Sequence, residues 1–198
     1  MNKSCFLFLC IVITLPVCAQ KGFGVIGGVN NSTSSSRYAD WRVGGFIGGL
    51  YELQLEKKIY LQPRLVLSYQ ENQRSPEFQT QWNANLPVLV SLQIELSDKS
   101  RLGLNLGPYL QYAVFGRQKT IIQHTPSPGT AMILPSVSSL NWWHYDFMQK
   151  ITYGGQIGAQ LEYKTFICTI DFKHSICRRH LNLDGFENTL QFGIGCRF

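Results

Sequence analysis

Histidine and serine are the residues of this sequence that come nearest to a catalytic arrangement. His174 and Ser175 are adjacent, but neighbouring residues of a β-strand point to opposite faces and cannot share one site. His124 and His144 lie in a segment rich in serine and proline, where we interpret them as solvated loop residues. The chain carries no nucleophile-elbow, zinc-protease, phosphate-loop or dinucleotide-binding motif. The sequence therefore predicts a protein that is not an enzyme.

Cysteine offers no better candidate for chemistry. Three of the six cysteines fall in the first 18 residues, which leaves Cys168, Cys177 and Cys196. An odd number is not a disulfide framework, and no Cys/His spacing suggests zinc. We expect no metal and no cofactor, and we interpret these cysteines as small apolar residues on strands. If the last hairpin pairs residue 166 with residue 198, Cys168 lies opposite Cys196 and a disulfide becomes possible.

The N-terminus has the features of a secretory signal peptide. Lys3 supplies the positive charge, and the uncharged run from Cys5 to Val17 is too short to span a bilayer comfortably. Small residues follow, so we expect cleavage after Ala19. Lipidation at Cys18 is the alternative, which Val17 disfavours because a small residue is needed there. The predicted division is a signal peptide over residues 1–19 and one β-barrel domain over residues 20–198.

Composition narrows the fold class further. Only 15% of the 198 residues are charged, whereas 13% are aromatic and 18 residues are glycine. This combination excludes a disordered chain and a charged helical bundle. A mean hydropathy of -0.05 argues against a polytopic helical membrane protein. An all-β domain, soluble or in a membrane, remains.

The pattern of apolar residues has a period of two. In the last segment, LQFGIGCRF (residues 190–198), every second residue from Leu190 is apolar, and residues 86–96 alternate in the same way. The opposite face carries mainly glycine, glutamine, asparagine and serine, which suit a crowded barrel interior better than a water-exposed surface. Eight such segments can be recognised, over residues 21–30, 42–55, 58–71, 82–96, 101–117, 147–163, 165–179 and 187–198.

Connections between these segments alternate between short and long. Short turns are expected near residues 56–57, 97–100 and 164, and long loops over residues 31–41, 72–81, 118–146 and 180–186. Tyrosine, tryptophan and phenylalanine gather near both ends of the segments, as aromatic belts do at membrane interfaces. The sequence therefore predicts an all-β fold: an eight-stranded antiparallel up-and-down transmembrane β-barrel that follows a cleaved signal peptide.

Charged and amide side chains on the inward face should fill the interior. Charges of both signs must pair there, because an unpaired buried charge is costly. Gln62 and Gln160 are also predicted to point inward. A passage for ions or small solutes is the alternative. The predicted polar network of the lumen consists of Glu52, Arg64, Glu95, Arg101, Gln156, Glu162, Asp171, Lys173 and Arg197.

Arginines also gather near the long-loop rim. Their guanidinium groups could contact outer-membrane lipid, lipopolysaccharide in particular, through bidentate bonds to phosphate. Nucleic acid is excluded as a partner despite the formal net charge of +6, because the chain is predicted to be exported and belted with aromatic residues. This candidate rim consists of Arg37, Arg42, Arg74, Arg117, Arg178 and Arg179.

Several segments resemble the Bacteroidetes-type outer-membrane β-barrel family that includes PorT. They are the glycine-rich start GVIGGVN (residues 24–30), LQPRL (residues 61–65), LGPYL (residues 106–110) and the closing LQFGIGCRF. Arg64 stands where the family has glutamate. The resemblance implies a barrel in the cell outer membrane that the barrel-assembly machinery inserts. It also implies an accessory role in secretion, and it carries no catalytic signature.

Two hypotheses for function follow. The first is a small outer-membrane barrel with a structural or interaction role, which includes an accessory role in secretion or surface assembly. The second is a soluble periplasmic or secreted barrel that binds an apolar ligand, as lipocalins do. The two differ in which face is apolar: the outward face in the first and the inward face in the second.

The orientation in the membrane can be tested with protease. Residues 118–146 contain Pro126, Pro128, Gly129 and Pro135, which disfavour strand pairing. We expect protease added to whole cells to cleave this segment first, because long loops of such barrels face outward. Cleavage that occurs only after lysis would reverse the predicted orientation.

Overall fold

A computed structural model describes residues 22–34, 41–74, 77–122, 136–141, 151–176 and 186–198. The predicted signal peptide lies outside these residues. Among them, no helix is both long and apolar enough to cross a membrane. The described strands are β1 (Phe23–Ser34), β2 (Trp41–Tyr51), β3 (Leu53–Glu56), β4 (Ile59–Arg74), β5 (Glu77–Ser97), β6 (Ser100–Ile122), β7 (Ser136–Asn141), β8 (Ile151–Tyr163), β9 (Phe166–Ser175) and β10 (Glu187–Arg197).

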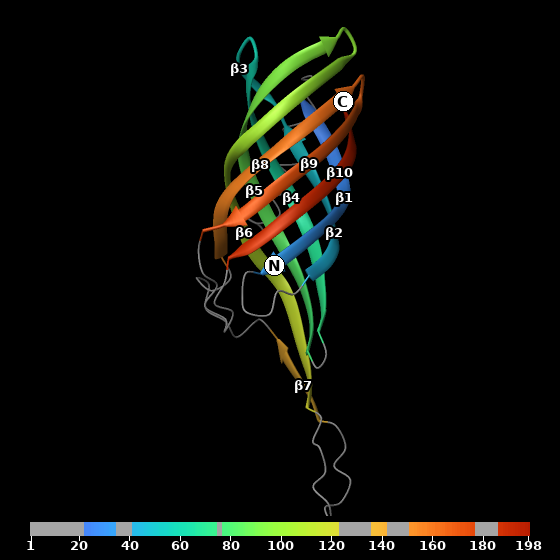
Figure 1. Ribbon diagram of the computed structural model, residues 1–198, viewed down its shortest axis with the longest axis vertical. Helices are drawn as coiled ribbons and strands as arrows, with labels where there is room; N and C mark the ends of the chain where they lie inside the picture. The colour runs from blue at the N-terminus through green and yellow to red at the C-terminus, as the bar shows by residue number, and fades with distance from the viewer. Residues whose placement is uncertain (1–21, 35–40, 75–76, 123–135, 142–150, 177–185) are drawn as a thin grey trace, which may run out of the picture.

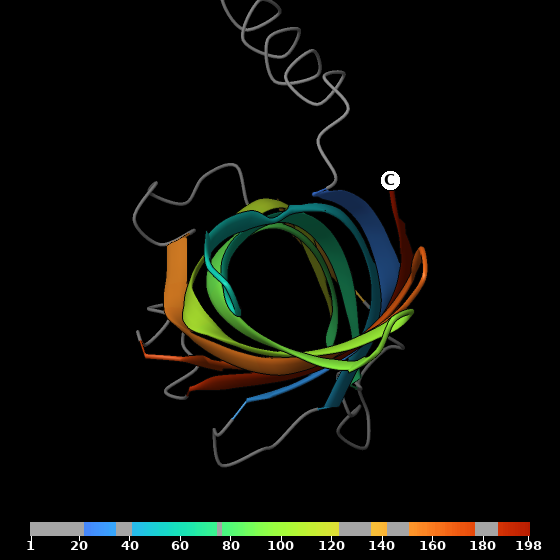
Figure 2. The same ribbon diagram turned by 90° about the horizontal axis from the view of Figure 1, so that it is seen from above.

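The strands form one closed antiparallel sheet (Figures 1 and 2). Around the ring, β1 pairs with β2, β2 with β4, β4 with β5, β5 with β6, β6 with β8, β8 with β9, β9 with β10, and β10 with β1. β3 follows β2 after a single residue, Glu52, and pairs with β4, whereas β7 pairs with β6 beyond the wall. Counting β2 and β3 as one, the wall is an eight-stranded barrel, as the alternating pattern predicts.

The expected loop over residues 72–81 is mostly strand. β4 and β5 remain paired up to Arg74 opposite Glu77, so only residues 75 and 76 lie between the paired ends. β6 likewise continues to Ile122 and pairs with β7, which places paired strand inside the loop expected over residues 118–146. Polar residues suggested loops here, but ladder hydrogen bonds form between backbones whatever the side chains are. The two hairpins extend well past the other strands (Figure 1).

Inward and outward residues alternate as expected. On β5, Leu92 and Ile94 are exposed on the outer face, whereas Ser91 and Gln93 are buried inside. On β6, the side chain of Leu104 is outside and that of Asn105 is inside. The apolar face is therefore the outer one, which favours the membrane barrel over the lipocalin-like alternative.

A small apolar cluster inside the barrel was not predicted. It consists of Ile26, Phe46, Leu50, Val66 and Ile167. Phe46 reaches past β1 to β10, where a Cβ on Gly193 would lie 2.9 Å from its ring carbon Cζ. The absence of a side chain at Gly193 is therefore what makes room for the ring.

The pairing expected in the last hairpin is wrong by two residues. Cys168 lies opposite Ile194, and Cys196 lies opposite Phe166. Both cysteines are free, so the structure contains no disulfide between them. A shift of two residues leaves every side chain on its predicted face, because the period of a strand is two. Cys177 lies outside the described residues.

The outward parity predicts a large cost for one substitution. We expect Leu104→Arg to lower the free energy of unfolding by roughly 2–4 kcal/mol if the site is near the bilayer midplane, because it places a charge in hydrocarbon. Unfolding in urea of protein reconstituted in lipid vesicles measures the change. The control Leu104→Met keeps an apolar side chain and should cost less than about 1.5 kcal/mol. Equal stability of the two variants would mean that this face does not contact lipid.

Candidate functional site in the barrel interior

Arg64 and Asp171 form an ion pair that crosses the barrel. Arg64 lies on β4 and Asp171 on β9, which are four strands apart in either direction around the ring. Nη1 of Arg64 donates to Oδ2 of Asp171 at 2.8 Å, and the two side chains are 1% and 3% exposed. Because the partners come from opposite walls, their side chains occupy the middle of the lumen.

A second ionic group centres on Arg197 of β10. Its guanidinium donates to Glu52, between β2 and β3, and is paired with Glu162 of β8. Glu162 also accepts from Arg101 of β6, which in turn donates to Gln93 at 3.1 Å. Glu52, Glu162 and Arg197 are all buried, whereas Arg101 is partly exposed. Opposite charges therefore link four regions of the wall.

Gln62 and Gln160 join the two ionic groups into one network. Gln62 Nε2 donates to Glu52 Oε1 at 2.7 Å and to Gln160 Oε1 at 3.0 Å, and its Oε1 accepts from Arg64 Nε at 2.9 Å. Gln160 Nε2 donates to Glu162 Oε1 at 2.7 Å. An amide that donates on one side and accepts on the other suits this bridging role. Their position on the inward face was the signal by which the sequence indicated them.

Lys173 and Gln156 are buried but lie beside this network rather than in it. The ammonium group of Lys173 lies 5.6 Å from the centroid of the Tyr109 ring, which is cation–π geometry. Gln156 Oε1 has no protein partner. Tyr109 was not among the predicted interior residues; its inward position on β6, two residues from Gly107, was the available signal.

Glu95 was predicted to join the network, and the structure contradicts this. Its side chain is exposed, although it lies on the same side of β5 as the buried Gln93. Glu95 is three residues from the turn that joins β5 to β6, and it lies past the end of the neighbouring β4, whose first residue, Ile59, pairs with Leu92. Beyond the rim, an inward-facing side chain meets water instead of an opposite wall.

The predicted arginine rim is described only in part. Arg42 is 7% exposed and lies on the inward side of β2, so it is not a surface residue at the rim. Neighbouring side chains of a strand alternate between the two faces, so the Arg42 side chain points inward because that of Val43 points outward. For Arg74 and Arg117 the structure describes the backbone but not the side chain. Arg37, Arg178 and Arg179 lie outside the described residues.

Uncharged polar groups line the interior toward the long hairpins. Gln70 Nε2 donates to Ser32 Oγ at 2.8 Å, and Ser32 and Thr189 share a hydrogen bond of 2.8 Å. Several buried amide and hydroxyl atoms here have no protein partner, including Asn30 Oδ1 and Asn85 Oδ1. Such groups are normally satisfied by water, so we expect ordered water in this part of the lumen.

The residues considered for catalysis are not brought together. His174 is exposed on the outer face, where its Nδ1 lies 2.7 Å from Asn188 Oδ1, whereas Ser175 is buried on the inner face. His124, His144 and His180 lie outside the described residues. Within the described residues, no three His, Cys, Asp or Glu side chains are placed to hold a metal ion.

The cross-barrel pair can be tested by a double-mutant cycle. We expect Arg64→Met alone, or Asp171→Leu alone, to lower the free energy of unfolding by about 3–5 kcal/mol, because each leaves a buried charge without its partner. The double variant should lose less than the sum of the two. Unfolding in urea from vesicles measures all four proteins. Additive losses would show that the two side chains do not interact.

The comparisons with known proteins agree with this architecture. The sequence profile of the outer membrane protein β-barrel domain matches residues 18–178. A search of curated proteins gives no match. Neisserial surface protein A, a solved structure, is 12% identical, with a TM-score of 0.55 over 89% of this chain and 97% of that one.

Two further solved structures are similar at lower scores. Ail, the attachment invasion locus protein of Yersinia pestis, is 13% identical, with a TM-score of 0.46 over 90% of this chain and 100% of that one. The outer membrane enzyme PagL is 10% identical, with a TM-score of 0.46 over 84% of this chain and 97% of that one. The sequence match, which covers most of the chain, decides the assignment. The chain belongs to the outer membrane protein β-barrel domain family and is a small β-barrel of the outer membrane.

Proposed function

We propose that this protein is a non-conducting, non-catalytic barrel with a structural or interaction role in the outer membrane. The observation that carries the proposal is the polar network that crosses the lumen from wall to wall. Arg64 and Asp171 meet from opposite strands, and Gln62 and Gln160 connect them to the Arg197 group. A barrel whose interior is filled in this way anchors and positions what lies at its rim instead of conducting solutes.

The size of the barrel supports a closed interior. Eight strands leave a lumen that side chains can just fill. For an ion to pass, the Arg64–Asp171 pair would have to separate, which would leave two buried charges without partners. The energy of that separation opposes conduction in the resting barrel.

The extended hairpins are the part of the barrel best suited to contact a partner. β4–β5 and β6–β7 continue past the other strands and keep their backbone pairing there (Figure 1). Strand pairing makes them stiffer than open loops of the same length. Together with the PorT-like segments, they support an accessory role in secretion or surface assembly.

The proposal also includes lipids and the insertion machinery of the outer membrane as partners of this protein. Outer-membrane lipid surrounds the exposed apolar belt, and lipopolysaccharide phosphates are the proposed counter-ions of the arginines near the long-hairpin rim. The barrel-assembly machinery would insert the chain.

Conductance measurements test the closed lumen. We expect the purified barrel in planar lipid bilayers to give no steady single-channel conductance, because the network blocks the ion path. The variant Gln62→Ala/Arg64→Ala removes two side chains from the centre of the lumen and should raise ion permeation above the wild-type level. Leu104→Met, which changes only the outer face, is the matched control and should stay closed. Steady ohmic conductance of the wild-type barrel would contradict the proposal.

A further inference from the structure

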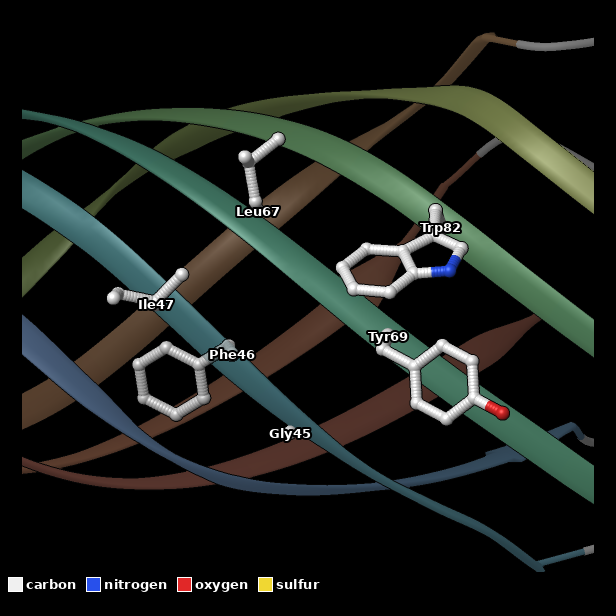
Figure 3. A pocket seen from close by; sticks show the side chains of 6 residues that line it. All are labelled: Gly45, Phe46, Ile47, Leu67, Tyr69 and Trp82. Atoms are coloured by element: carbon white, nitrogen blue, oxygen red, sulfur yellow. The ribbon is translucent and has the colours of Figure 1, made fainter.

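The outer surface of the barrel has an apolar hollow beside the long β4–β5 hairpin. It has a volume of about 310 Å³, and the atoms that line it are almost all carbon. Figure 3 shows the lining residues on three neighbouring strands, with the Tyr69 and Trp82 rings at one end and Ile47 and Leu67 at the other. They are Gly45 and Ile47 of β2, Leu67 and Tyr69 of β4, and Trp82 of β5, with Phe46 between the first two, although its ring belongs to the apolar cluster inside the barrel.

A glycine on the outer face makes this hollow. Gly45 occupies an outward position between the exposed residues Val43 and Ile47. It lies opposite Tyr69, which in turn lies opposite Trp82, and the two rings are 5.1 Å apart between centroids. Because Gly45 lacks a side chain, the row of outward side chains is interrupted next to a pair of packed aromatic rings.

The surroundings decide what can occupy such a hollow. Its walls continue the belt of exposed apolar side chains, and in the outer membrane this belt faces hydrocarbon. Water has no hydrogen-bonding partners in an apolar recess and is not expected to stay there. The volume is at the lower end of the roughly 300–1,000 Å³ of small-molecule sites, which suits a segment of one chain and not a whole lipid.

The position of the aromatic rings indicates how a chain would enter. The Tyr69 hydroxyl donates to Glu71 Oε2 at 3.2 Å, two residues closer to the hairpin tip. Tyrosine and tryptophan prefer the level of the lipid headgroups, with the apolar part of the ring toward the hydrocarbon. The hollow therefore begins next to the interface and extends into the apolar layer.

We infer that the hollow at Gly45 is a binding site for one acyl chain of a membrane lipid in the leaflet next to the long hairpins. The packed Tyr69 and Trp82 rings, tilted by 52° to each other, form a rigid wall against which the chain is held longer than in the surrounding bilayer. The site depends on the outer-membrane location and not on the closed lumen, so it goes beyond the proposed function and is tested separately.

Quenching of Trp82 fluorescence tests the site. The protein would carry Trp41→Phe, Trp142→Phe and Trp143→Phe, so that Trp82 is the single tryptophan, and would be placed in phosphatidylcholine vesicles with brominated acyl chains. We expect Gly45→Leu to reduce the quenching, because the new side chain fills the hollow and displaces the chain from the ring. A Cβ at Gly45 meets only the Gly28 carbonyl oxygen, at 3.4 Å, so the substitution should be tolerated.

A second outward glycine provides the matched control. Gly155 lies on the outer face of β8, and a Cβ there would meet nothing within 4 Å. Gly155→Leu should leave Trp82 quenching unchanged. Gly45→Ala, which fills the hollow only partly, should give an intermediate value and keeps the test usable if Gly45→Leu folds poorly. Folding of each variant is checked by its heat-modifiable mobility on gels.

Two outcomes would overturn the inference. Equal quenching in wild type, Gly45→Leu and Gly155→Leu would show that no chain is held at this hollow. Sedimentation in detergent provides the second readout, because another copy of this chain could also cover the face. A wild-type dimer that Gly45→Leu converts to monomer would assign the hollow to self-association and not to lipid.

Discussion

The ion pair between Arg64 and Asp171 crosses the lumen, and the need to form it determines how most of the interior side chains are arranged. Neither charge can be buried alone, because the cost of removing an ion from water is several kcal/mol even after relaxation. Their approach at 2.8 Å places both side chains in the middle of the barrel. Gln62 and Gln160 then connect this pair to the second ionic group, in which Arg197 is paired with Glu52 and Glu162.

The two faces of the wall are held by different forces. Outside, apolar residues such as Leu92 and Leu104 are stabilised by lipid, and the family assignment to the outer membrane explains why so many are exposed. Inside, ion pairs and amide hydrogen bonds connect the opposite sides of the wall, and the small apolar cluster around Phe46 adds packing. Because the interior is filled, contacts with other molecules are expected at the rim and on the outer surface. The two long hairpins lie at the rim, and the hollow at Gly45 lies on the outer surface.

Sequence periodicity predicted the wall of the barrel better than its ends or its centre. A period of two assigns each residue of β5 or β10 to a face without knowledge of its partners, so even a two-residue error at Cys168 left the faces correct. The polar run over residues 72–81 looked like a loop because strands outside the membrane need no apolar face. Glu95 and Arg42 show the same limit, since burial near a rim depends on where the neighbouring strands end. Which residues meet across the lumen depends on strand tilt and stagger, which a sequence does not display.

Solid-state NMR on the barrel in lipid bilayers tests the cross-barrel contact most directly. Arginine labelled with ¹⁵N in the guanidinium group and aspartate labelled with ¹³C in the carboxylate would be examined for through-space transfer. A hydrogen bond of 2.8 Å between Arg64 Nη1 and Asp171 Oδ2 predicts a cross-peak from nuclei about 4 Å apart. The peak should disappear in Asp171→Asn protein prepared with the same labels. Absence of the peak in the wild-type barrel would contradict an interior closed by this pair.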